Sequence, residues 1–220
     1  MKTHAEIFEI KEQVLHLLPQ KAIFWEDKKT LLLSDLHLGK ASHFRKSGIP
    51  IPTKVLQKDL DCLTHLVDQY HPDTICFLGD LFHSHINQEF DLLQQWLEKY
   101  PALKKELVRG NHDILPAAYY KRAGIKVYPI AVTKAPFVFV HDPMEEPDTS
   151  KYYFSGHIHP GVHFSGLGRQ HLSLPCFYFG ENQALLPAFG AFTGLYAIQP
   201  KKADQVFVIG EGKVMRIGSK

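Results

Sequence analysis

Five short polar clusters, rich in Asp, His and Asn, each directly follow an apolar run of the chain, and they begin at Ser34, Gly79, Arg109, His141 and Ser155. Ligands of α/β proteins bind beyond the carboxyl ends of the strands, so these clusters would meet at one site if the apolar runs are strands. Carboxylate, imidazole and amide groups form a mixed nitrogen and oxygen donor set, which suits Mn, Fe, Zn, Co or Ni better than calcium. The sequence therefore indicates a divalent metal site.

Taken one at a time, the clusters have simpler explanations. Gly-Asp after a strand is usually a turn, and a lone His-x-His on a loop is more often solvated than metal-bound. The ordered succession of all five favours metal binding. In extended chain, residues two apart point to one side, which we expect for Asp35 with His37 and for His157 with His159. His141 precedes His157 by only 16 residues, a spacing that favours adjacent antiparallel strands.

The elements that position these clusters form an α/β pattern. Three continuous apolar runs, typical of strands buried on both faces, alternate with two segments of helical periodicity. This order predicts parallel strands joined by right-handed helical crossovers. The predicted elements are a strand at 31–33, a helix at 53–70 with Thr53 as N-cap, a strand at 75–78, a helix at 90–100 and a strand at 107–108.

Beyond about residue 125 we expect brief strands without helices, in an antiparallel half packed on the parallel half. The first thirty residues predict short strands in a meander, and no linker or repeat divides the chain, so we expect one domain spanning residues 1–220. The expected later strands lie at 126–128, 130–133, 137–140, 152–154, 162–164, 175–179, 194–198, 205–209 and 214–217.

The composition excludes several classes of protein. A chain with 45% hydrophobic and 22% charged residues is neither disordered nor fibrous. A net charge of +2 provides no bulk attraction for nucleic acid, although a local basic strip remains open. The three cysteines include no CxxC, which argues against a disulfide framework or thiolate zinc. No apolar run approaches the roughly 20 residues of a membrane span, and the N-terminus does not resemble a signal peptide. We expect a cytoplasmic protein with no membrane partner.

The clusters resemble the signature blocks of the calcineurin-like metallophosphoesterases, in the family's order. The matching segments are Asp35-x-His37-x-Gly39, Gly79-Asp80, Gly110-Asn111-His112-Asp113, His141 and Gly156-His157-x-His159. The resemblance implies an α/β fold with mixed sheets, a four-layer αββα sandwich whose crest holds two divalent metal ions, with manganese favoured. It also implies hydrolysis of phosphoric esters by in-line attack of a metal-bridging hydroxide.

Carried over block by block, the resemblance gives nine residues a role. His112 would be the general acid that protonates the leaving oxygen, and Asp113 would orient it. The first metal would be held by Asp35, His37, Asp80 and His159, and the second by the bridging Asp80 with Asn111, His141 and His157.

Longer segments, 38–45, 79–84, 156–161 and 186–194, resemble the DNA ligase-associated metallophosphoesterases, which are linked to DNA repair. This likeness implies a phosphodiesterase or nuclease acting on single-stranded DNA or DNA ends, with a DNA ligase or helicase as partner. Lys40, His43 and Arg45 belong to the densest basic cluster close to a motif and are candidates for binding substrate phosphates. His83 is a further candidate, in a place where many superfamily members carry an acidic residue.

Two alternatives remain open. A phosphatase or a phosphodiesterase for small nucleotides would use the same metal centre with a differently shaped pocket. A non-catalytic protein-binding scaffold is the third reading, because some superfamily members have lost ligands and bind proteins instead. All seven ligand positions are filled in this sequence, which argues against the scaffold.

Overall fold

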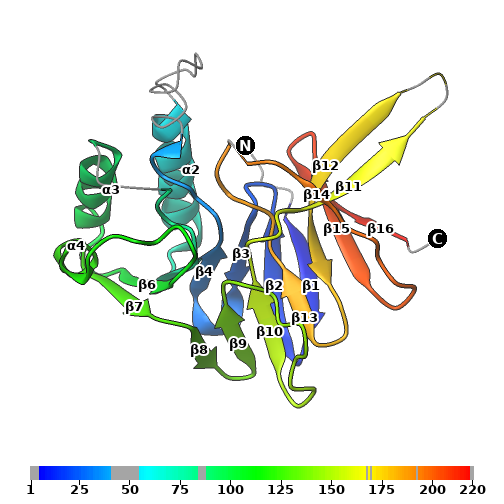
Figure 1. The fold of residues 1–220 in the computed structure, drawn as a ribbon, viewed down its shortest axis with the longest axis horizontal. Coiled ribbons are helices and arrows are strands. Elements are labelled where there is room, and N and C mark those ends of the chain that lie inside the picture. Colours follow the sequence, from blue (N-terminus) through cyan, green and yellow to red (C-terminus); the bar gives the residue numbers. More distant parts are fainter. Residues whose placement is uncertain are drawn as a thin grey trace.

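The computed structural model describes residues 5–40, 55–83, 88–166, 168, 170–191 and 193–218, without the side chains of residues 55, 56 and 88. Two β-sheets pack against each other, and the helices lie against one of them (Figure 1). The Thr53 cap and the candidates His43 and Arg45 fall outside the described residues.

The first sheet is mixed. Its strands lie side by side in chain order, antiparallel from β1 to β4 and parallel from β4 to β7. Helices α2 and α3 form the crossovers between the parallel strands, as predicted, and the short helix α4 precedes β7. The elements are β1 (Glu6–Ile10), β2 (Gln13–Leu18), β3 (Ala22–Trp25), the 3₁₀ turn η1 (Glu26–Lys28), β4 (Thr30–Leu33), α2 (Val55–Tyr70), β5 (Thr74–Leu78), α3 (Gln88–Glu98), β6 (Lys104–Val108), α4 (Ala117–Arg122) and β7 (Ile125–Tyr128).

The second sheet is also mixed and comes from the rest of the chain. Its path runs β14-β11-β12-β13-β10-β9-β8, and β15 with β16 joins it through β12. The hairpin of β11 and β12 projects away from the body (Figure 1). The strands are β8 (Ala131–Lys134), β9 (Phe137–Val140), β10 (Tyr152–Ser155), β11 (Pro160–Ser165), β12 (His171–Phe179), β13 (Gln183–Leu185), β14 (Tyr196–Ala197), β15 (Gln205–Gly210) and β16 (Lys213–Ile217).

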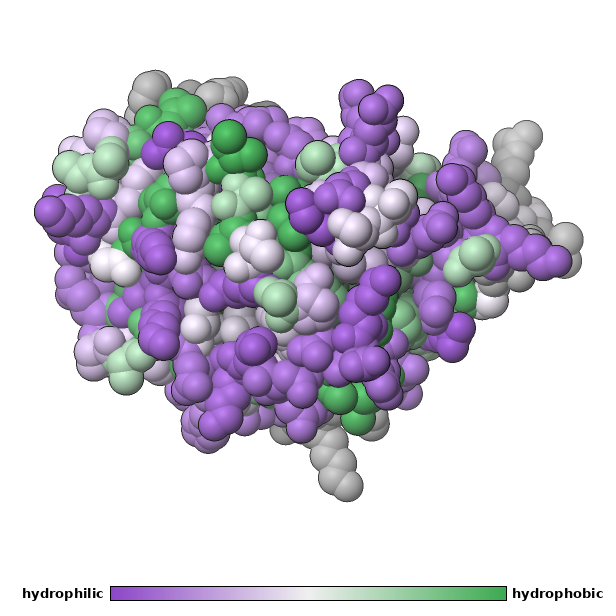
Figure 2. All heavy atoms as spheres, turned by 90° about the horizontal axis from the view of Figure 1, so that it is seen from below, coloured by the Kyte–Doolittle hydropathy of each residue, from purple (hydrophilic) through white to green (hydrophobic). Residues whose placement is uncertain are grey.

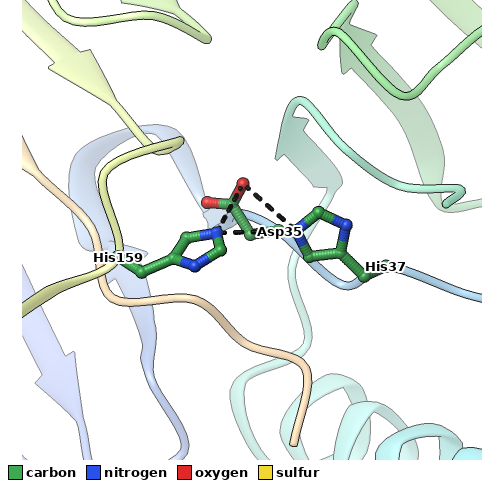
Figure 3. A group of neighbouring side chains, drawn as sticks. All are labelled: Asp35, His37 and His159. Carbon is green, nitrogen blue, oxygen red and sulfur yellow. Dashed lines mark hydrogen bonds and ion pairs between the residues drawn. The ribbon is translucent and has the colours of Figure 1, made fainter. Parts of the chain in front are cut away.

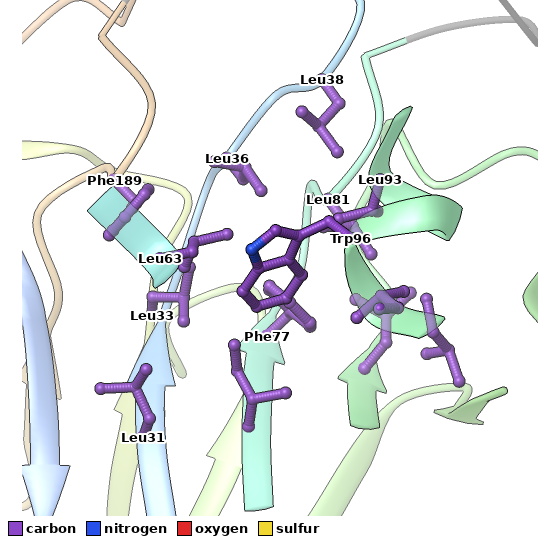
Figure 4. Close-up of a cluster of buried hydrophobic side chains, with 14 of the residues drawn as sticks. Leu31, Leu33, Leu36, Leu38, Leu63, Phe77, Leu81, Leu93, Trp96 and Phe189 are labelled. Atoms are coloured by element: carbon purple, nitrogen blue, oxygen red, sulfur yellow. The ribbon is translucent and has the colours of Figure 1, made fainter. Parts of the chain in front are cut away.

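The continuous apolar runs of the parallel strands are explained by burial on both faces. Side chains alternate along a strand, so Leu31 and Leu33 of β4 face the helices while Leu32 faces the second sheet. On the helical side, Trp96 of α3 lies among leucines of both layers (Figure 4), and its indole N–H donates to Thr64 Oγ1 of α2 at 2.8 Å. Each buried side chain of this size stabilises the fold by about 1.5–3 kcal/mol.

Aromatic side chains fill the space between the two sheets. Trp25 of β3 contacts Phe137 of β9 with ring centroids 4.9 Å apart, and Phe137 in turn packs on Phe154 of β10 at 4.8 Å. These residues are fully buried. Because this one core joins both sheets, it also fixes the carboxyl ends of β4 and β5 relative to those of β9 and β10.

The predicted mixed α/β fold is confirmed, with two corrections to strand direction. β7 pairs in parallel with β6 and extends the parallel half, whereas the sequence analysis assigned it to the antiparallel half. β9 and β10 are parallel, not antiparallel, because the loop at 141–151 returns the chain to the starting edge. Within the described residues, the α-helices contribute to the core of the first sheet only, and the outer face of the second sheet at Cys176 is covered by Val162, Leu174 and Ile198 instead of a helical layer.

The molecular surface mixes polar and apolar residues. On the face seen from below, apolar side chains lie in small groups between hydrophilic ones (Figure 2), which is ordinary for a globular protein. Among the described residues, no helix is long and apolar enough to cross a bilayer.

Candidate metal centre

A first group of metal-ligating side chains combines the end of β4 with the loop after β10. Asp35, His37 and His159 point toward one another (Figure 3). Asp35 Oδ1 lies 3.3 Å from His159 Nε2 and 3.9 Å from His37 Nε2, and the two imidazole nitrogens are 3.5 Å apart. One carboxylate oxygen and two imidazole nitrogens therefore converge on a common point.

A second group lies beside the first and joins the ends of β5 and β9 to the same loop after β10. It consists of Asp80, His141 and His157. Asp80 Oδ1 lies 3.4 Å from His141 Nε2, which is 3.3 Å from His157 Nδ1. His141 Nδ1 lies 2.9 Å from the Leu78 carbonyl, so this nitrogen donates its proton there and leaves Nε2 free to act as a ligand.

Asp80 connects the two groups. Its Oδ1 faces His141, and its Oδ2 lies 3.8 Å from His37 Nε2. Burial alone would raise the pKa of Asp80, but hydrogen bonds from His141 and from the His112 backbone N–H lower it to about 2. The pKa of His141 is raised to about 9, because the Asp80 carboxylate outweighs the opposing effect of burial. The same negative field would stabilise a divalent cation in place of that proton.

The donor atoms fit such cations. Asp35 Oδ1 is buried and has no hydrogen-bond partner, while Asp35 Oδ2 accepts the His157 backbone N–H at 3.0 Å. A buried carboxylate oxygen without a partner is costly unless a cation satisfies it. Burial lowers the pKa of His37 to about 4, so this imidazole is neutral and can donate its lone pair.

The backbone at these positions is unusual. Asp35, His37, Asp80, His157 and His159 all have positive φ values, between 49° and 64°. Such conformations cost about 1–2 kcal/mol each in residues with a Cβ, and they gather at functional sites. The expectation of extended chain is therefore wrong. Asp35 and His37 still reach one group, but His157 and His159 go to different groups.

Glycines allow the strand ends to approach each other closely. Gly79 has a φ of 83°, and a Cβ at this position would overlap the His141 ring. A Cβ on Gly156 would overlap the Ser34 hydroxyl and crowd Asp35 Oδ2. The glycines of the two motifs are thus required for the second sheet to deliver its histidines beside the first.

The Gly110-Asn111-His112-Asp113 segment follows β6. Asn111 is exposed and lines a cavity together with His141. The exposed His112 ring stacks on His83, with centroids 4.8 Å apart, and lies 5.5 Å from the His37 ring. The His112 backbone N–H donates to Asp80 Oδ1 at 2.9 Å, which fixes this residue next to both groups.

Asp113 is buried and binds backbone N–H groups. Its Oδ1 accepts the Phe82 N–H at 3.0 Å, and its Oδ2 accepts the Gly110 N–H at 2.9 Å. Burial raises the pKa of this carboxyl to about 6. Through these two hydrogen bonds, Asp113 ties the segment that carries His112 to the backbone after β5.

Two of the four predicted substrate-binding residues lie in the described part of the chain. Lys40 is partly buried close to Asp35 and Asp80, and burial lowers its pKa. His83 is partly buried, and its ring lies 5.6 Å from His37 as well as against His112. Both are therefore next to the metal-ligating groups.

Sequence reasoning missed three supporting side chains. Ser34 donates a hydrogen bond to Asp35 Oδ2, Glu89 accepts the Gly39 N–H, and Asp142 Oδ1 lies 3.2 Å from His157 Nδ1. Ser34 and Asp142 adjoin predicted ligands, so their position in the chain was a usable signal. Glu89 is 50 residues from Gly39, and no local pattern connects them.

Comparisons with known proteins give one matching family model and several similar solved structures. The family model of the calcineurin-like phosphoesterases matches residues 28–164. The nuclease MPE of Pseudomonas putida is 30% identical, with 97% of this chain and 100% of that chain covered and a TM-score of 0.82. A protein of unknown function from Aquifex aeolicus is 21% identical, covering 64% and 82% of the two chains, with a TM-score of 0.43. Yfce, a phosphoesterase from E. coli, is 12% identical, covering 83% and 88%, also with a TM-score of 0.43. The curated proteins contain no match.

The family model covers more than half of the chain, including both metal-ligating groups. The family uses a dinuclear metal centre, and the two groups joined by Asp80 are suited to hold one. The protein is therefore a metal-dependent phosphoric ester hydrolase, and the chain belongs to the calcineurin-like phosphoesterase family.

Proposed function

We propose that the protein is a phosphodiesterase that cleaves DNA, at single strands or strand ends. The observation that carries the hydrolytic centre is the position of Asp80 between two groups of ligands, 3.4 Å from His141 and 3.8 Å from His37. The preference for DNA is supported by the 30% identity, over nearly the whole chain, to a protein described as a nuclease.

Seven side chains would hold the two cations. Asp35, His37, Asp80 and His159 would hold one cation, and Asp80, Asn111, His141 and His157 the other. When bound, two divalent cations lower the pKa of water and neutralise charge on the phosphoryl oxygens. The carboxylates and imidazoles of the chain fix the spacing of these charges, and the hydrogen bond from His141 to Leu78 holds that ring in the ligating tautomer.

His112 is the proposed general acid. Its ring is exposed beside the ligands, and its backbone is anchored on Asp80 at 2.9 Å. From this position an imidazolium could give its proton to the leaving oxygen of the substrate, which makes departure of a poor leaving group easier. Asp113 contributes by holding the loop through Gly110 and Phe82.

Several finer proposals follow from the same residues. The nitrogen and oxygen donor set suits Mn, Fe, Zn, Co or Ni, and the family resemblance favours manganese among them. Lys40, beside Asp35 and Asp80, would contact a substrate phosphate. The longer segments that resemble the DNA ligase-associated branch support a role in repair, with a ligase or helicase as partner, and the scattered cysteines support the cytoplasm as the location. The core shared by both sheets supports a single domain over residues 1–220.

A substrate panel tests the proposal. Metal-free protein is reconstituted with Mn²⁺ and assayed on bis-nitrophenyl phosphate, mono-nitrophenyl phosphate and end-labelled single-stranded DNA, with Asp80→Asn protein purified in parallel to exclude a contaminating nuclease. We expect hydrolysis of the diester and of DNA by wild type only. Preference for the monoester would favour a phosphatase, and hydrolysis of bis-nitrophenyl phosphate without cleavage of DNA would favour a small-nucleotide enzyme. Protein that binds no metal and hydrolyses nothing would favour the scaffold.

A further inference from the structure

A cavity of about 400 Å³ opens next to the second group of ligands. It lies between three loops, which follow β6, β7 and β9, and His141 and Asn111 form part of its wall. Anything bound in it would therefore touch the reaction centre. The volume lies at the lower end of the range of about 300–1,000 Å³ found for small-molecule sites.

Apolar side chains line much of this cavity without being buried. Ile130, at the turn between β7 and β8, is 80% exposed, and Met144, in the loop after β9, is 36% exposed. Pro129 and Pro143 beside them are also part of the wall. Because Ile130 is so exposed, folding removes little of its apolar surface from water. An apolar ligand packed against the side chain would bury that surface and be bound more tightly as a result.

The charged side chains at the cavity favour a base over a phosphate as its occupant. Asp142 and Glu145 line it, and only Arg109 opposes them. The Arg109 guanidinium lies 5.9 Å from the centre of the Tyr120 ring, which holds it in place. Two carboxylates repel a phosphate, whereas they accept hydrogen bonds from the amino and N–H groups of a base.

We propose that this cavity binds the base of the nucleotide next to the scissile phosphodiester. The inference rests on the proposed function, and it assigns the apolar wall of Ile130 and Met144 to one face of that base. A base that is paired and stacked in a duplex is unable to enter a cavity of this size, so the pocket selects unpaired nucleotides. It makes the enzyme specific for single strands and frayed ends.

Four dinucleotide substrates test the proposal. They are thymidylyl-thymidine, the two forms that lack the base on one side, and the form that lacks both bases. For wild type with Mn²⁺, we expect kcat/KM to fall about tenfold when one particular base is removed and to change little when the other is removed. A tenfold loss is the lower end of what a single apolar contact contributes in enzyme pockets.

The variants Ile130→Ser and Met144→Ser should remove this difference while leaving the rate on the doubly abasic substrate unchanged. The matched control is Ile7→Ser, because Ile7 on β1 is also an exposed isoleucine, at 65%. It should behave as wild type on all four substrates. The two substitutions lie on different loops, so the same effect in both variants would not be explained by a local folding defect in one of them.

The outcomes separate this inference from the proposed function. Equal rates of wild type on all four substrates, or a preference that survives both pocket variants, would overturn the base pocket alone. Protein that cleaves single-stranded DNA but hydrolyses none of the four would also overturn the pocket alone. Failure of wild type to cleave single-stranded DNA would overturn the proposed function, and the pocket with it.

Discussion

At the scale of single residues, the site depends on the Asp80 carboxylate, which contacts both groups of metal-ligating side chains. Asp80 meets a histidine from each group, and its Oδ1 also accepts the backbone N–H of His112. The residue that would join the two metals thus also positions the proposed general acid. In the proposed mechanism, metal binding and proton transfer would both depend on this side chain, so they are best separated by changing His112 and leaving Asp80 intact.

Replacement of His112 by alanine should preserve metal binding and slow hydrolysis selectively. The imidazole is outside both groups of ligands, so we expect the metal content of His112→Ala protein to equal that of wild type. Loss of a general acid typically costs about 10²–10⁴-fold, and the cost falls on poor leaving groups. DNA cleavage should therefore lose far more than cleavage of a nitrophenyl diester, whose leaving group needs no proton.

The control for this variant is His163→Ala, because His163 is an exposed residue of strand β11; this substitution should change neither rate. If His112→Ala slowed both substrates by the same factor, or lost metal, the imidazole would have a role in binding and not in proton transfer.

At the scale of elements, the site is made by strand ends that approach more closely than side chains normally allow. Gly79 directly follows β5, and the ring of His141, which directly follows β9, lies against the Gly79 backbone. The absence of a Cβ at this point is what lets His141 Nε2 reach Asp80.

Gly79→Ala should damage both folding and metal binding. A positive φ costs alanine about 1–2 kcal/mol, and here the new methyl group would also displace the His141 ring. Gly124→Ala is the matched control, because Gly124 has a φ of 68° and open space around it. We expect Gly124→Ala to lose only the conformational cost in thermal unfolding and to keep its metal, whereas Gly79→Ala loses more stability and binds metal more weakly. Equal effects of the two substitutions on both measurements would contradict the steric argument.

How far the sequence predicts these elements depends on how strongly each one is patterned. Helices α2 and α3 and the strands between them were predicted within two or three residues, because burial on one or both faces leaves a clear apolar period. The six-residue helix α4 buries only Tyr120, and β13 fully buries only Ala184, so neither leaves such a period. The direction of β10 relative to β9 was predicted wrongly because the length of a loop does not fix the side to which the chain returns.

In the site, too, some features were predictable from the sequence and others were not. The ligand positions follow from residue types at strand ends, and the structure brings Asp35, His37 and His159 together, as it does Asp80, His141 and His157. Extended chain would put His157 and His159 on one side, whereas the family resemblance assigned them to different metals. The structure divides them between the two groups, with left-handed backbone at both histidines. The apolar cavity at Ile130 was likewise invisible, because its walls come from three separate loops.

At the scale of the whole molecule, the centre lies where the two sheets meet. The first sheet contributes Asp35, His37 and Asp80, and the second contributes the three histidines. The aromatic core between the sheets therefore stabilises the site as well as the fold, since any sliding of one sheet over the other would separate the two halves of each group.

A carboxylate away from the centre links the layers and makes the stability of the molecule depend on pH. Asp59 of α2 is partly buried near Lys21, in the turn between β2 and β3, and accepts the backbone N–H of Ala191. Ala191 follows Gly190, which donates to the Asp35 carbonyl at 3.1 Å. Burial raises the pKa of Asp59 from 3.8 to about 6, even though Lys21 and the Ala191 N–H oppose this effect.

A raised pKa means that the folded protein holds this proton more tightly than the unfolded chain does. Its contribution to stability is complete below pH 3.8 and is lost as the pH rises through about 6. Asp59→Asn, which mimics the neutral acid, should therefore gain stability relative to wild type between pH 4 and pH 7, by up to about 3 kcal/mol and by less to the extent that solvent screens the partly buried group. Asp61→Asn on the exposed side of the same helix is the control. In urea unfolding across this range, the difference between wild type and Asp59→Asn should grow with pH, while the difference for Asp61→Asn should stay constant. Parallel curves for both variants would show that the Asp59 carboxylate is charged throughout, and that Lys21 and Ala191 fully compensate for its burial.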